Sequence, residues 1–88
     1  TIFREILSNI PERQKEVLYA IAKDGEARQV TSSAFIKRHR LASASAVQSA
    51  IKKLLDKDFI TEINKTYSLT DRLFALWIKT VYGTGFRL

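Results

Sequence analysis

TSSAFIKRHRLASASAVQSAIKKLLDKDFITEINKTYSL, residues 31–69, contains the pattern of a short helix, a tight turn, a longer helix and a β-hairpin in that order. A hydroxyl of Thr31, Ser32 or Ser33 can cap the first helix by accepting a hydrogen bond from a free backbone N–H. The longer helix is expected over residues 43–57, with Ser43 as its cap. Apolar residues recur along it at helical spacing and should face the core: Val47, Ala50, Ile51, Leu54 and Leu55.

The hairpin follows directly in residues 59–69, which are rich in β-branched and aromatic side chains. A two-residue loop of Asn64 and Lys65 would place Glu62 opposite Tyr67. Residues 28–30 are a candidate third strand. Two helices joined by a short turn and followed by a hairpin indicate a winged helix-turn-helix, a mainly α fold with a small β-wing. Residues 43–57 are then the recognition helix.

The flanking segments predict one domain with short extensions. Residues 1–10 carry the apolar stripe of a short helix, which can also be a linker from a preceding domain, and Pro11 breaks it. The domain proper is expected over residues 11–82, with a helix that starts at Pro11 and ends at a Gly25 cap. Residues 83–88 form a tail. The chain has no Met, which indicates a piece of a larger protein.

The turn between the two central helices, residues 38–41, lacks the glycine often found there. His39 or Arg40 is therefore expected to adopt an unfavourable backbone conformation. After the hairpin, Ser68 or Thr70 should cap the last helix, with Asp71 favourable near its N-terminus.

The net charge of +6 is concentrated in the helix-turn-helix. Residues 27–55 hold six basic residues and no acidic one, whereas the rest of the chain holds nine of each. This asymmetry favours an anionic partner, although a merely solvated basic face is the alternative. The candidates for phosphate contact are Lys37, Arg38, His39, Arg40, Ser43, Lys53 and Lys65.

The outer face of the recognition helix is small and polar, which would let it approach base edges closely. Gln48 can make a paired hydrogen bond to adenine. The candidates for base reading are Ser45, Gln48, Ser49 and Lys52. The alternative is a tolerant exposed surface, because no arginine occupies a base-reading position and arginine to guanine is the commonest specific contact.

The last helix is apolar nearly all round, so it should be buried on more than one side. Part of it is expected to meet a protein partner, either the rest of the parent protein or a second copy of the domain. The candidates for this interface are Phe74, Trp77, Ile78 and Val81.

Composition argues against several other functions. One histidine, no cysteine and scattered acidic residues supply no recognisable catalytic group or metal site, so we expect no enzyme activity, metal or cofactor in these 88 residues. No apolar run approaches membrane-spanning length and no leader pattern is present. The absence of cysteine suits a reducing compartment, and we expect a cytoplasmic protein without a membrane partner.

Several motifs resemble the C-terminal winged-helix domain of bacterial and archaeal P-loop ATPases of the AAA+/STAND type. They are PERQKEVL at 11–18, TSSAF at 31–35, SASAVQSA at 43–50, KDFI at 57–60 and YSLTDRLFALW at 67–77. The resemblance implies a parent protein that hydrolyses ATP in a domain before Thr1. No phosphate-binding glycine loop lies in the chain itself. The sequence departs from the family at His39 and Arg40, where an aromatic-glycine pair is expected.

Two functions therefore compete. In the leading one, the chain is a DNA-binding module whose recognition helix enters the major groove. In the alternative, the same fold is a protein-interaction module that docks on its ATPase domain or a partner, or forms a homodimer through the last helix.

Overall fold

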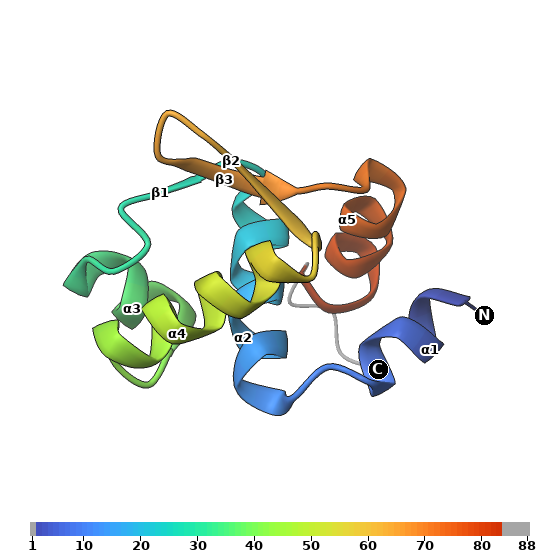
Figure 1. Ribbon diagram of the computed structural model, residues 1–88, viewed down its shortest axis with the longest axis horizontal. Helices are drawn as coiled ribbons and strands as arrows, with labels where there is room; N and C mark the ends of the chain where they lie inside the picture. Colours follow the sequence, from blue (N-terminus) through green and yellow to red (C-terminus); the bar gives the residue numbers. More distant parts are fainter. Residues whose placement is uncertain (1, 84–88) are drawn as a thin grey trace.

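The computed structural model describes residues 2–83 and confirms the predicted fold class (Figure 1). The helices are α1 (Ile2–Ser8), α2 (Glu12–Asp24), α3 (Ser33–His39), α4 (Ala44–Asp56), α5 (Arg72–Ile78) and the π-helical turn η1 (Lys79–Gly83). The strands are β1 (Ala27–Arg28), β2 (Ile60–Ile63) and β3 (Thr66–Leu69). The helix-turn-helix is α3–α4, and the β2–β3 hairpin follows as the wing. The predicted tail lies outside the described residues, except for Gly83.

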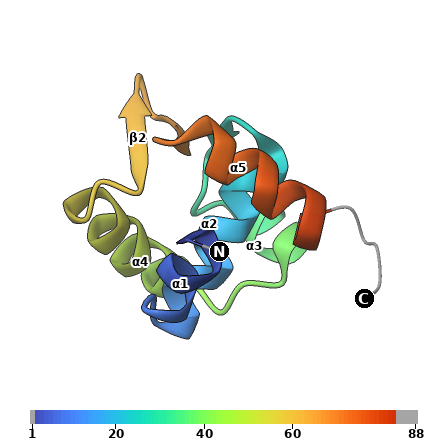
Figure 2. The ribbon, with the colours of Figure 1, turned by 90° about the vertical axis from the view of Figure 1, so that its right-hand side faces the viewer.

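The centre of the molecule is α2, which packs against α4 on one side and against α5 and η1 on another. Its apolar stripe predicts this burial, since Leu18 and Ile21 are both 0% exposed. Leu54 of α4 meets the same core and is also fully buried. In Figures 1 and 2, α4 and α5 lie on different sides of α2. The core therefore holds the recognition helix by its inner face and leaves the outer face exposed.

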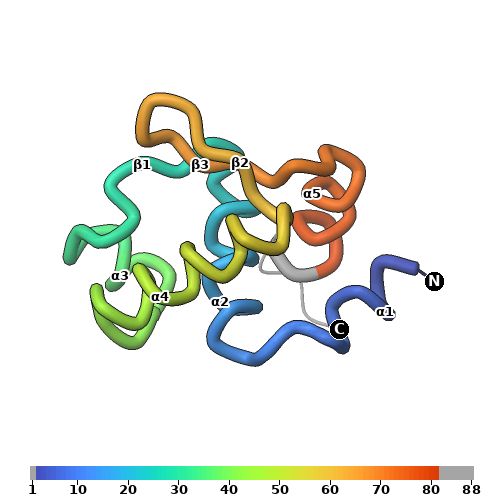
Figure 3. The backbone as a smooth tube through the Cα atoms, in the orientation of Figure 1, coloured from blue at the N-terminus to red at the C-terminus, as the bar shows by residue number. Residues whose placement is uncertain are grey.

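The N-terminal helix α1 lies beside α5 at one end of the molecule, and α3 lies at the other end (Figure 3). Leu7 and Ile10 are buried in the common core. Phe3 stacks on Phe74 of α5 with ring centroids 5.1 Å apart. Residues 2–10 are thus packed against the domain in the structure.

Side-chain caps start the three later helices. The Oγ atoms of Ser32 and Ser43 accept hydrogen bonds from the backbone N–H groups of Phe35 and Ala46, each at 3.2 Å. Ser32 is therefore the cap among the three hydroxyl candidates. The expectation of Ser68 or Thr70 at the start of α5 is wrong, because the carboxylate of Asp71 accepts from the N–H groups of Leu73 and Phe74.

The turn between α3 and α4 contains the expected strain. Arg40 adopts the left-handed conformation (φ 56°, ψ 47°), which a glycine would adopt without a steric penalty. The N–H of Leu41 donates to the carbonyl of Ile36 and that of Arg40 to the carbonyl of Lys37, the two bonds of a Schellman motif. These bonds end α3 and set the direction in which the chain enters α4.

The hairpin has the predicted register. Asn64 and Lys65 form the loop with positive φ values of 51° and 61°, as a type I′ turn requires. Glu62 pairs with Tyr67 across β2 and β3. The third strand is present as β1, but it begins one residue earlier and ends two residues earlier than expected, since Gln29 has a positive φ of 49°. It pairs with β3, so the sheet order is β1-β3-β2.

Replacing Arg40 by glycine should stabilise the domain by about 0.5–1 kcal/mol. The left-handed conformation costs a residue with a Cβ roughly 1–2 kcal/mol, and part of the relief is lost to the greater freedom of glycine in the unfolded chain. Urea unfolding of the two proteins measures the difference. Arg40→Ala is the control, because it removes the charge but keeps the Cβ. Equal stability of the Gly and Ala variants would show that the left-handed conformation at residue 40 does not destabilise the domain.

Candidate nucleic-acid interface

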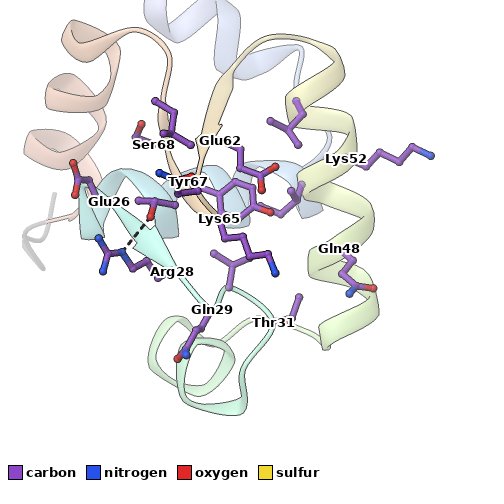
Figure 4. Close-up of a pocket in the computed structure, with 16 residues that line it drawn as sticks. Glu26, Arg28, Gln29, Thr31, Gln48, Lys52, Glu62, Lys65, Tyr67 and Ser68 are labelled. Atoms are coloured by element: carbon purple, nitrogen blue, oxygen red, sulfur yellow. Dashed lines mark hydrogen bonds between the residues drawn. The ribbon is translucent and has the colours of Figure 1, made fainter.

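An open groove of about 1290 Å³ lies between α4 and the wing (Figure 4). One wall is α4 and the other is the hairpin, and the segment from β1 to α3 lines one end. The apolar part of its lining is supplied by Val30, Ile51, Leu55 and Ile63. The charged residues that line it are Glu26, Arg28, Lys52, Glu62 and Lys65. The groove is the concave surface next to the recognition helix.

The four candidates for base reading share the outer face of α4. Ser45, Gln48, Ser49 and Lys52 are all exposed, and their spacing places them on one side of the helix. Gln48 and Lys52 also line the groove, whereas Ser45 and Ser49 lie outside its lining. The structure therefore leaves all four side chains accessible to a ligand that covers this face.

The opposite wall is formed by Glu62, Lys65 and Tyr67 of the wing. Figure 4 shows these side chains on the side of the hairpin that faces α4. Burial raises the pKa of the Tyr67 phenol above its ordinary value of 10.0, and the nearby negative charge of Glu62 raises the pKa further. The Tyr67 hydroxyl is thus protonated at neutral pH and can donate a hydrogen bond into the groove.

Arg28 is a groove residue that we did not predict from the sequence. It lies on β1, and its Nε donates to the Thr66 Oγ1 atom of β3 at 3.1 Å. This bond fixes the side chain against the wing and leaves the guanidinium exposed. Two features of the sequence could have pointed to it: Arg28 belongs to the acid-free segment 27–55 and to the candidate third strand.

Two predicted phosphate contacts are instead engaged by Asp24 at the end of α2. Arg38 Nη2 lies 2.8 Å from Asp24 Oδ2, and its guanidinium lies over the Phe35 ring at 5.5 Å. His39 Nε2 lies 3.1 Å from Asp24 Oδ1, and its side chain is only 6% exposed. The expectation that His39 contacts phosphate is therefore wrong, because Asp24 of α2 and the Phe35 ring cover the imidazole. Arg38 is held in an ion pair.

The remaining candidates for phosphate contact are dispersed. Lys37, Arg40 and Lys53 are exposed, but none of them lines the groove. Ser43 is exposed as well, although its hydroxyl already caps α4. Lys65 alone of the predicted phosphate contacts lies at the groove, at the tip of the wing.

The last helix presents different residues from those expected. Phe74 and Ile78 are 3% and 1% exposed, so they belong to the core of this domain and cannot form an interface with a partner. Trp77 is half-buried and packs against Phe3, and Val81 is half-buried. The exposed apolar residues of α5 are Leu73 and Leu76, at 69% and 61%.

Comparison with known families identifies the class of the domain. A family model described as "Probable winged helix domain" matches residues 1–80. The chain therefore belongs to this winged helix family. A winged helix domain is in general not an enzyme, and the family indicates a DNA-binding or interaction module. Comparisons with curated proteins and with solved structures gave no significant match.

Within residues 2–83, no group of three or more His, Cys, Asp and Glu residues is arranged to hold a metal ion. No helix in the same range is long and apolar enough to cross a membrane.

Replacing Asp24 by alanine should destabilise the domain by about 1–2 kcal/mol, because it removes the acceptor shared by Arg38 and His39 and leaves a covered imidazole without its partner. Urea unfolding measures the loss. Glu16→Ala is the matched control, since Glu16 is an exposed acid of the same helix. If the loss of stability is no larger than that of the control, the contacts of Asp24 with Arg38 and His39 do not stabilise the packing of α2 against α3.

Proposed function

We propose that this winged helix domain binds duplex DNA, with α4 in the major groove and the wing beside the adjacent backbone. The observation that carries the proposal is the exposed polar face of α4, which borders the same groove as Lys65 of the wing and Arg28 of β1. A helix with small side chains can approach base edges closely, and the major groove admits one helix.

The residues divide into two roles. Gln48 is the main candidate for a base contact, since its amide can donate to and accept from adenine, and Ser45 and Ser49 can add single hydrogen bonds. Lys52 and Lys65 lie on opposite walls of the groove and are placed to contact phosphates. Arg28 adds a third cation to the lining, and its side chain lies on the side of the wing away from α4 (Figure 4).

The proposal extends to the parent protein. The resemblance of the motifs to C-terminal domains of AAA+/STAND ATPases supports a role for the domain as the DNA-binding part of a larger cytoplasmic ATPase. ATP would be bound in the preceding domain, because the motifs of the present chain belong to the winged helix alone.

Replacing Lys52 and Lys65 together by alanine should weaken binding to duplexes of any sequence. If each side chain contacts a phosphate, the slope of log affinity against log salt should become shallower by about 2. Fluorescence anisotropy with a labelled random-sequence duplex at several salt concentrations measures both effects.

The control for this experiment is the double variant Lys23→Ala with Lys79→Ala. It removes the same charge from two exposed lysines that do not line the groove. Equal salt slopes for the two double variants would assign the binding to net charge alone. Absence of binding by the unmodified domain at low salt would refute the DNA-binding function itself.

A second function, protein docking through α5, is favoured by one observation. Leu73 and Leu76 are one helical turn apart and largely exposed, so they form a small apolar surface away from the groove. This surface could meet the ATPase domain of the parent or a second copy of the chain. It is compatible with DNA binding because the two surfaces differ.

Replacing Leu73 and Leu76 together by serine should leave the stability within about 0.5 kcal/mol, since both side chains are already exposed. If the domain forms a homodimer through α5, sedimentation equilibrium should detect a dimer that the double variant loses. Ile63→Ser is the control, because Ile63 is a similarly exposed apolar residue on the wing. A monomer at all concentrations would exclude the homodimer.

A further inference from the structure

Glu62 is an acidic residue in the groove that the proposed function does not explain. It is exposed on β2, and Figure 4 shows its side chain on the wing wall that faces α4, beside Tyr67 and Lys65. Among residues 2–83 no basic side chain forms an ion pair with its carboxylate. A carboxylate in this position repels any phosphate that enters the groove.

The charge of the groove is much lower than that of the chain. Three cations line it (Arg28, Lys52 and Lys65) together with two carboxylates (Glu26 and Glu62), which gives a net charge of +1. The whole chain carries +6. Most of the excess positive charge of the chain therefore lies outside the groove. Because the net charge of the groove is so small, removal of one carboxylate changes it substantially.

Of the two carboxylates, Glu62 is the one that faces the recognition helix. Figure 4 shows Glu26 on the far side of the wing, next to Arg28, whereas Glu62 points into the space between the hairpin and α4. A DNA strand beside the base-reading face of α4 would pass closer to Glu62. Charges on concave surfaces act more strongly than charges on open ones, because the low-dielectric walls focus the field.

We infer that Glu62 is a specificity-determining residue that weakens sequence-independent binding of DNA. This inference rests on the proposed function. Attraction to phosphates supplies most of the affinity for random DNA, whereas contacts to bases supply the preference for a site. A carboxylate among the groove cations lowers the attraction to phosphates and leaves the base contacts unchanged. The affinity of the domain for DNA therefore depends more on the base contacts of α4.

Replacing Glu62 by glutamine should raise the affinity for a random-sequence duplex by about three- to tenfold, because it changes the net charge of the groove from +1 to +2. The dependence on salt should become steeper. Anisotropy titrations with a labelled random-sequence duplex at low and moderate salt measure both quantities. Circular dichroism confirms that the variant keeps the fold.

Glu5→Gln is the matched control. Glu5 is exposed on α1, which lies away from the groove, and its replacement changes the net charge by the same amount. Glu62→Thr is a second test variant that removes the charge with a side chain favoured in strands, and it should show the same gain.

The outcomes separate the two proposals. A gain for both Glu62 variants with little change for Glu5→Gln supports the role of Glu62. Binding by the unmodified domain with no gain in the Glu62 variants, or with an equal gain for Glu5→Gln, overturns this inference and leaves the DNA-binding function intact. No binding by any of the proteins at low salt overturns both.

Discussion

The contact between α2 and α4 is the constraint on which the rest of the structure depends. Leu18 and Ile21 of α2 and Leu54 of α4 belong to one core, and all three side chains are fully shielded from water. Because the apolar face of α4 is buried in this core, the residues on its opposite face remain exposed to solvent. The same core receives Ile60 and Leu69 at the base of the wing. One packing arrangement therefore positions both walls of the groove.

The path of the chain around this core depends on backbone conformations that glycine usually adopts. Arg40 ends α3 and Asp58 ends α4, both with positive φ, and each helix closes with the paired hydrogen bonds of a Schellman motif. The buried side chains of Leu41 and Leu54 accompany these turns. Packing on the core and the closing hydrogen bonds thus hold conformations that the residues disfavour on their own.

Charge is distributed differently in space and in sequence. The segment 27–55 contains no acidic residue, yet Asp24 reaches Arg38 and His39 from the preceding helix, and Glu62 enters the groove from the following hairpin. The surface formed by residues 27–55 is therefore less basic than the sequence of this segment suggests. Under the proposed DNA-binding function, this arrangement would reduce general attraction to phosphates and increase the relative weight of the contacts made by α4.

The sequence by itself determined the elements, the Ser43 cap of α4 and the buried faces of α2 and α4, because these depend on local spacing and on neighbours within four residues. The apolar spacing of residues 47–54 and the Asn64-Lys65 loop are sufficient to predict α4 and the hairpin register. Only the tertiary structure decided which charged and apolar side chains are available to a partner. Asp24 and His39 are 15 residues apart, and Phe74 differs from Leu73 in burial solely through the packing of α5. Such contacts join segments distant in the chain, and no local pattern specifies them.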